Sequence, residues 1–236
     1  MSARADAAVV GALRRASVYR LLGAALAYPM AARVGALARW AELATGAWAD
    51  PALAGALARF GAAARGSDPE TLAAEHVRLF DREVRCPPYE GAWGAVAVTG
   101  KAALLADVAG FYAAFGLGPA AGQPETEDHL GAELEFMGAL ALKEAWALAR
   151  GQGEGLDVTR AAARAFLAEH LGCWAGSFAR HLAATSPAAF YRRLAALLEA
   201  WLARELAGLE VTPLRRADGP AGGERAPMAC PMAPAG

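Results

Sequence analysis

The chain has 236 residues, of which 56% are hydrophobic and 20% charged, and this is the composition of a folded globular protein rather than a disordered one. Its formal net charge of −1 excludes the long-range positive field with which a protein attracts nucleic acid or an acidic membrane. Alanine is very abundant and β-branched residues are scarce, so the composition favours helix along the whole chain.

The first helix is predicted over residues 5–28. Arg14 and Arg15 precede an apolar stretch at residues 21–30, an order that superficially matches a twin-arginine export signal. Arg20 interrupts the apolar pattern, and no stretch of the chain reaches the roughly 20 consecutive apolar residues that a membrane helix needs. The pattern therefore predicts an amphipathic first helix and no stable insertion into a membrane.

Helices are predicted next over residues 32–45 and 51–64. A further helix begins in the segment 67–70, where Ser67 is expected to cap it, and runs to about residue 80. Residues 81–94 contain the consecutive prolines Pro87 and Pro88, which cannot continue a helix, so an ordered loop is expected there.

The second half of the chain repeats the helical pattern after a Gly/Ala/Pro-containing segment. Helices are predicted over residues 101–115, from 126 or 127 to 149, over 157–184, and from 186 onward. The expected organisation is an N-terminal helical section (1–115), a hinge (116–123), a C-terminal helical section (124–212) and a disordered tail (213–236).

The sequence contains no motif for catalysis, metal binding or cofactor binding. None of its four histidines follows a glutamate by three residues, as in di-iron bundles, and phosphate-binding glycine loops and Gly-x-Ser-x-Gly are missing. Cys86, Cys173 and Cys230 are too few and too irregular for a disulfide framework or a zinc site, and they fit a reducing compartment. We therefore predict no catalytic residue, no metal, no cofactor and a cytoplasmic protein.

Two polar segments remain as candidate sites. Residues 125–134 place acidic side chains around His129 at a helix start, which predicts either a capped helix end with a local ion pair or a site for an anion or extended peptide. Arg78 to Glu90 is either a rigid loop in which Tyr89 is a packing anchor or part of a peptide-binding surface.

Together these segments resemble the TorD/DmsD/NarJ family of redox-enzyme maturation proteins. The residues that carry the resemblance are Arg78-Leu79-Phe80 with Pro87-Pro88-Tyr89-Glu90, then Glu125, Asp128, His129, Glu133 and Leu134, and finally Phe166-Leu167, His170-Leu171, Trp174 and Phe178. Thr126 stands where the family usually has proline. The spacing around Tyr89 is nearest to the branch that serves nitrate reductase, dimethylsulfide dehydrogenase and ethylbenzene dehydrogenase.

The resemblance implies an all-α, multi-helix bundle of the TorD-like type with two packed sections joined by a hinge. It also implies a chaperone that binds the apo catalytic subunit of a molybdenum enzyme of the dimethyl-sulfoxide-reductase family. Such a chaperone holds the twin-arginine signal or an N-terminal segment, assists insertion of the molybdenum cofactor and delays export.

A twin-arginine signal is basic and then apolar, so its receptor should offer carboxylates beside an apolar groove. The residues predicted to bind the client are Tyr89, Glu90, Trp93, Glu125, Glu127, Asp128, His129, Glu133 and Phe136. Two other functions stay open from the sequence: a helical scaffold or regulator that acts by oligomerisation, and a nucleotide-binding enzyme. The expected state is a monomer or a domain-swapped dimer.

Overall fold

The computed structural model describes residues 3–94, 98–118, 125–214 and 219–220, and the all-α fold class is confirmed. The α-helices are α1 (Ala3–Leu26), α2 (Ala31–Thr45), α3 (Pro51–Arg65), α4 (Pro69–His76), α5 (Val98–Ala114), α6 (Leu130–Arg150), α7 (Gly153–Phe166), α8 (Gly172–Thr185) and α9 (Ala189–Leu209). Two π-helical turns, η1 (Val77–Asp81) and η3 (Leu167–Leu171), and the 3-10 turn η2 (Glu90–Ala92) complete the described elements.

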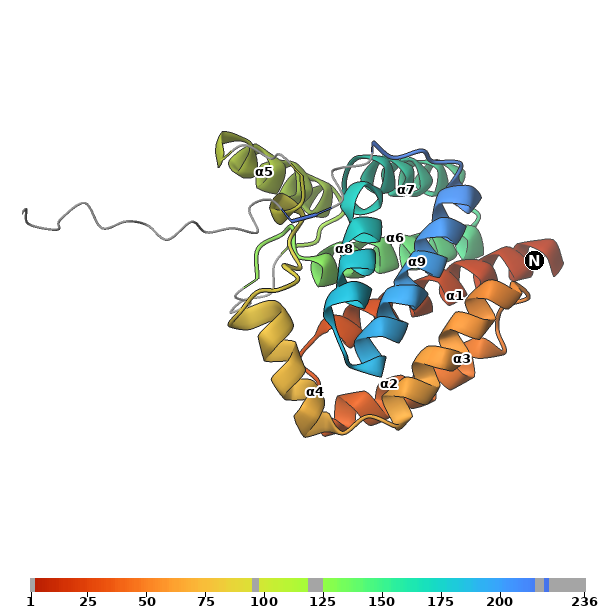
Figure 1. Ribbon diagram of the computed structural model, residues 1–236. Helices are drawn as coiled ribbons and strands as arrows, with labels where there is room; N and C mark the ends of the chain where they lie inside the picture. The colour runs from red at the N-terminus through yellow and green to blue at the C-terminus, as the bar shows by residue number, and fades with distance from the viewer. Residues whose placement is uncertain (1–2, 95–97, 119–124, 215–218, 221–236) are drawn as a thin grey trace, which may run out of the picture.

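Helices that are distant in the sequence pack side by side. Helix α1 packs against α6, and α3 packs against α9. In Figure 1 the consecutive helices α8 and α9 also run next to each other, and α4 and α5 lie at one side of the bundle. One continuous hydrophobic core joins helices from both predicted sections. The division into two sections stays a prediction, because these shared contacts do not define where a boundary would lie.

The starts of α3 and α4 follow from their capping residues. The Asp50 carboxylate accepts a hydrogen bond from the Ala52 N–H at 2.9 Å, and Asp68 accepts one from the Thr71 N–H at 2.8 Å. A proline follows each aspartate at the first helical position, where its missing N–H costs nothing. The prediction that Ser67 caps α4 was wrong, because its hydroxyl donates to the carbonyl of Ala63 at 2.7 Å instead.

The helix predicted over residues 157–184 is divided in the structure into α7, the π-helical turn η3 and α8. A π-helical turn holds one extra residue and frequently occurs at functional sites. At its end, a Cβ atom on Gly172 would lie only 2.2 Å from the Leu167 carbonyl oxygen. The turn therefore requires glycine at this position.

Replacing Gly172 with alanine is expected to lower the free energy of unfolding by about 1–3 kcal/mol, because the backbone around Leu167 must shift. Gly176 lies one turn further along α8, and only the Arg180 side chain approaches the position of its Cβ, at 3.6 Å. Gly176→Ala is the matched control and should stabilise the helix by about 0.5–1 kcal/mol. Urea unfolding measures both changes; equal effects of the two substitutions would contradict this account.

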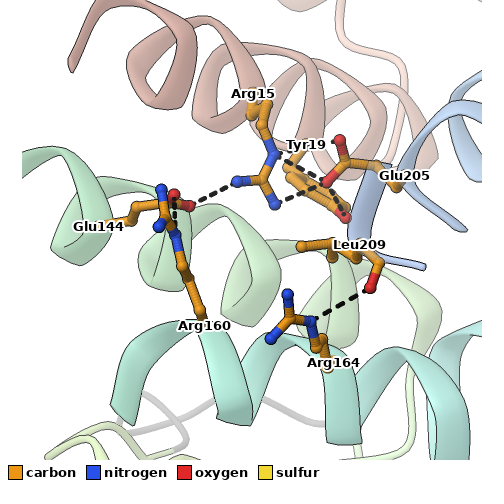
Figure 2. Close-up of polar contacts among 7 residues, drawn as sticks. All are labelled: Arg15, Tyr19, Glu144, Arg160, Arg164, Glu205 and Leu209. Atoms are coloured by element: carbon orange, nitrogen blue, oxygen red, sulfur yellow. Dashed lines mark hydrogen bonds and ion pairs between the residues drawn. The ribbon is translucent and has the colours of Figure 1, made fainter. Parts of the chain in front are cut away.

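A charged network inside the bundle joins four helices (Figure 2). The Arg15 guanidinium on α1 contacts Glu205 of α9 at 2.9 Å and Glu144 of α6 at 2.5 Å, and Arg160 of α7 contacts Glu144 at 2.8 Å. Tyr19 donates its hydroxyl to Glu205 at 2.9 Å. Burial opposes the charge on Arg15, but the Glu205 carboxylate holds the pKa of this guanidinium above its usual value.

Two predicted segments fall largely outside the described residues, namely 119–123 of the hinge and 215–218 and 221–236 of the tail. Gly116 at the hinge's start has a φ of +70° and ends α5, where the Leu117 N–H donates to the Tyr112 carbonyl at 2.9 Å. Pro220 pairs with Trp93 in an isolated β-bridge. Among the described helices, none is long and apolar enough to cross a membrane.

Candidate functional site

A cleft of about 720 Å³ opens between the end of α1, the α4–η1 junction, the end of α5 and the start of α6. Its volume lies in the range of ligand-binding pockets, about 300–1,000 Å³. Both candidate segments contribute to it: Pro88 and Tyr89 come from the loop before η2, and Glu125, Thr126, Glu127 and His129 come from the segment before α6.

Backbone pairing holds the two segments together beside the cleft. Tyr89 and His129 form an isolated antiparallel β-bridge, and their rings meet edge to face at 5.2 Å. The Leu130 N–H donates to the Pro88 carbonyl, and the Glu90 N–H donates to the Asp128 carbonyl, both at 2.8 Å. The Pro-Pro loop is thus fastened to the start of α6, although about 40 residues separate them in the sequence.

His129 is the N-cap of α6, so this helix begins at Leu130 and not at residue 126 or 127 as predicted. Its Nδ1 accepts a hydrogen bond from the Gly131 N–H at 3.0 Å, which requires an unprotonated Nδ1. Burial lowers the pKa of His129, although the carboxylates of Glu125 and Asp128 oppose this effect. The cap is therefore neutral at physiological pH, and His129 adds no positive charge to the cleft.

The Arg78-Leu79-Phe80 motif supports the opposite wall through three different contacts. Arg78 binds Glu75 at 2.7 Å through two nitrogens and also donates to the carbonyl of Thr185 at 3.1 Å. Leu79 is fully buried in the core, whereas Phe80 lines the cleft. The motif therefore anchors η1 on the bundle and presents one aromatic side chain to the cleft.

The cleft combines aromatic walls with negative charge. Among the described residues, five aromatic side chains other than histidine line it, namely Tyr28, Phe80, Tyr89, Tyr112 and Phe136. The acidic residues that line it are Asp81, Glu125, Glu127 and Glu135, and no lysine or arginine occurs among the described residues of its lining. Such a surface suits a segment that is both basic and apolar.

His76 lies between Tyr28 and Phe80, whose rings it meets edge to face at 5.5 Å and 5.0 Å. Burial lowers the pKa of His76 to about 4 from its ordinary 6.5, although Asp81 opposes the shift. Between these two pH values the unfolded chain binds a proton at this position that the folded chain does not. The free energy of unfolding therefore falls as the pH falls through this window.

Replacing His76 with phenylalanine keeps a ring between Tyr28 and Phe80 and should flatten this pH dependence. As the pH is lowered from about 7 to about 5, the free energy of unfolding of the unmodified chain should fall by about 1 kcal/mol more than that of the variant. This difference is smaller than the full pKa shift implies, because the ring is partly exposed to solvent. Urea unfolding followed by circular dichroism at each pH gives the two slopes. Parallel slopes would show that His76 does not titrate as described.

Five of the nine predicted site residues line the cleft: Tyr89, Glu125, Glu127, His129 and Phe136. The other four, Glu90, Trp93, Asp128 and Glu133, do not line it and are fully buried. Because these four side chains are buried, the prediction that they contact a client directly is wrong. Their hydrogen-bond partners show that they support the surrounding structure from inside the fold.

Asp128 and Trp93 support the loop. The Asp128 carboxylate accepts hydrogen bonds from the Gly91 N–H at 3.0 Å and from the Thr126 hydroxyl at 2.5 Å. Trp93 donates its indole N–H to the Pro87 carbonyl at 2.8 Å. Asp128→Ala is therefore expected to disturb the loop itself.

Glu133 and Glu90 have buried partners in the C-terminal helices. Glu133 accepts the indole N–H of Trp174 at 3.1 Å, and no ion pair with His129 is found among the described residues. Glu90 contacts His170 at 3.1 Å. Both carboxylates are turned away from the cleft because the core provides polar partners there.

Among the described residues, six aromatic, histidine or acidic side chains line the cleft without having been predicted as site residues: Tyr28, His76, Phe80, Asp81, Tyr112 and Glu135. Asp81 directly follows the Arg78-Leu79-Phe80 motif, and Glu135 lies in the helix predicted after His129, so proximity to the two motifs was a usable signal. Tyr28 and His76 carried no such signal. They reach the cleft only because α1 packs against α6 and α4 lies beside these two helices.

The family model described as nitrate reductase delta subunit matches residues 47–180. The chain belongs to this family. The nitrate reductase delta subunit match covers both candidate segments and η3, and it confirms the resemblance to the TorD/DmsD/NarJ proteins.

Individual relatives agree with membership of the nitrate reductase delta subunit family. A selenate reductase assembly chaperone protein from Thauera selenatis is 34% identical over 122 residues, which span 50% of this chain and 61% of that protein. A crystal structure described as that of a redox enzyme maturation protein from Archaeoglobus fulgidus has a TM-score of 0.52 at 22% identity, covering 80% of this chain and 93% of that one, and supports the fold. The selenate reductase relative is named for assembly, which agrees with the prediction that the chain is not an enzyme.

Proposed function

We propose that the chain is a cytoplasmic chaperone that binds the apo catalytic subunit of a molybdenum enzyme of the dimethyl-sulfoxide-reductase family. It holds the subunit's twin-arginine signal, or an equivalent N-terminal segment, while the molybdenum cofactor is inserted, and so delays export. The observation that carries the proposal is the acidic, aromatic-walled cleft in a member of the nitrate reductase delta subunit family. The name of the selenate reductase assembly chaperone relative supports the same role.

The charges of the cleft fit the basic part of such a segment. Glu125 is exposed and Glu127 partly exposed at the rim, so both reach an arginine without the large desolvation cost of a buried ion pair. Because His76 and His129 are neutral at physiological pH, neither repels an arginine side chain. Electrostatic attraction of this kind mainly raises the rate of association and fixes the orientation of the bound segment.

The apolar part of the segment then contacts the aromatic walls. Phe136 is 3% exposed and lies against Tyr112 at a ring separation of 4.9 Å, so these two form a firm apolar floor. Tyr28 is 50% exposed at the rim, so covering it with a bound segment would bury the most additional aromatic surface. Aromatic residues that become buried in this way supply much of the binding energy in protein interfaces.

The same cleft disfavours the nucleotide-binding alternative. Phosphate groups are bound by lysine, arginine or free backbone N–H groups, and the described lining contains neither lysine nor arginine. At the start of α6 the His129 side chain already accepts the Gly131 N–H, so this helix end is partly satisfied. No specific observation favours the scaffold alternative over the chaperone.

An affinity pull-down from the native host, made while molybdenum enzymes are being produced, tests the proposal. We expect mass spectrometry to recover one molybdopterin-enzyme catalytic subunit that still carries its N-terminal signal. The cleft variant Glu125→Lys/Glu127→Lys serves as the bait control and should lose this subunit. Failure to recover any such subunit, while the enzyme is demonstrably made, would overturn the proposed function.

A further inference from the structure

A second polar cluster lies outside the cleft, where α5 meets the π-helical turn η3. It consists of Asp107 on α5 and Glu169 and His170 on η3. One ligand-type atom from each of the three side chains lies within 4.8 Å of the other two. The two carboxylates are exposed and His170 is buried.

The orientation of His170 is defined by Glu90, which lies behind it in the core. The ring is 2% exposed, and its Nδ1 lies 3.1 Å from a carboxylate oxygen of the fully buried Glu90. Because a carboxylate only accepts hydrogen bonds, Nδ1 carries a proton in this contact. In the neutral ring, Nε2 is then the nitrogen with a free lone pair.

That lone pair has no hydrogen-bond partner among the described residues, and it faces negative charge. Nε2 of His170 makes no hydrogen bond and lies 3.4 Å from a carboxylate oxygen of Asp107. A lone pair and a carboxylate repel each other at this distance unless a cation lies between them. A carboxylate that holds one ring nitrogen while the other faces ligand-type oxygens is the usual arrangement behind a metal-binding histidine.

We propose that Nε2 of His170 and the carboxylates of Asp107 and Glu169 bind one divalent transition-metal ion, with Zn²⁺ as the best-suited ion. Imidazole favours Zn²⁺ over Mg²⁺ and Ca²⁺, which prefer oxygen ligands alone. Zn²⁺ takes histidine nitrogen and carboxylate oxygen at about 2.0–2.2 Å, and the two exposed carboxylates can rotate inward to that distance. Solvent completes the coordination on the exposed side.

The bound ion would tie α5 to the bundle. Asp107 is on α5, and the same helix carries Tyr112, which lines the cleft and donates its hydroxyl to the Glu127 carbonyl at 2.9 Å. Metal binding therefore steadies one edge of the cleft. The π-helical turn, which requires Gly172 at its end, would then serve to hold His170 in position beside Glu169.

The competing explanation is a proton in place of the metal, which would make His170 an imidazolium ion paired with Glu90 and Asp107. Isothermal titration calorimetry of the full chain, freed of metal by a chelator, separates the two. A Cys230→Ser background and removal of any affinity tag reduce zinc binding elsewhere, and the remaining thiols, Cys86 and Cys173, are buried. We expect one equivalent of ZnCl₂ to bind and MgCl₂ to bind at least about 100-fold more weakly.

Variants that keep side-chain shape locate the ion. Asp107→Asn/Glu169→Gln should weaken Zn²⁺ binding by more than about 100-fold, and Glu90→Gln by about 10–100-fold, as outer-shell partners of metal ligands do. The control Glu154→Gln/Glu199→Gln removes two exposed carboxylates elsewhere and should leave affinity unchanged. Equal affinity of the Asp107→Asn/Glu169→Gln variant and the control, or no zinc binding by the unmodified ligand set, would overturn the proposal.

The test has a second readout that does not depend on client binding. If the ion joins α5 to η3, Zn²⁺ should slow amide hydrogen exchange in residues 98–114 of the unmodified chain and not of Asp107→Asn/Glu169→Gln. Unchanged exchange on zinc binding would place the ion elsewhere. Failure of the chaperone proposal would leave both readouts intact, because neither involves a client.

Discussion

Exchanging Glu125 and Glu127 for lysine is expected to weaken binding of a basic N-terminal client peptide by about 10–100-fold. The change turns two negative charges at the rim of the cleft into positive ones. In the unmodified chain, the described lining of the cleft contains no lysine or arginine. Attraction to the peptide's adjacent arginines thus becomes repulsion. Because both side chains are at least partly exposed, the effect should shrink as the salt concentration rises.

The probe is a fluorescent peptide with two adjacent arginines followed by an apolar stretch, copied from the subunit recovered in the pull-down and measured by anisotropy. Glu154→Lys/Glu199→Lys is the matched control, since it makes the same change in net charge at exposed positions outside the cleft. A peptide with both arginines replaced by glutamine should bind the unmodified chain and the cleft variant about equally. If the control variant weakens binding as much as the cleft variant, net charge and not the cleft is responsible.

Truncation of Arg15 to alanine should lower the free energy of unfolding by about 3–5 kcal/mol, because it leaves buried carboxylates without their cation. Glu205 is 3% exposed and receives both the Arg15 guanidinium and the Tyr19 hydroxyl. Glu144 would still have its ion pair with Arg160, so the loss of a cationic partner affects Glu205 most (Figure 2). The network joins α1, α6, α7 and α9, and its loss therefore affects the whole bundle and not one helix end.

Urea unfolding of purified variants measures this loss, and an exposed ion pair provides the matched control. Arg65 and Glu42 are each 62% exposed, so Arg65→Ala should cost less than about 1 kcal/mol. In a Glu205→Gln background, which removes the charge left behind, Arg15→Ala should cost clearly less than it does alone. A loss below about 1 kcal/mol for Arg15→Ala in the unmodified background would show that the network is not a major source of stability.

Local signals along the chain were enough for most helices and for the two motifs. Prolines at the first positions of α3 and α4, the Pro87-Pro88 break and the helical spacing of apolar residues all act over a few residues, so they are visible without a structure. The same holds for Tyr89, Glu125, Glu127, His129 and Phe136, which lie in or near the two motifs and line the cleft.

Burial and partner choice were decided only by the tertiary structure. Glu90, Asp128 and Glu133 have the same residue types as the rim acids Glu125 and Glu127, and nothing local distinguishes a carboxylate that faces solvent from one that meets a histidine or a tryptophan in the core. The Arg15 network and the Asp107–Glu169–His170 cluster depend likewise on contacts between distant segments. Such contacts follow from how the helices pack, because a side chain's environment is set by its neighbours in space and not by those in the sequence.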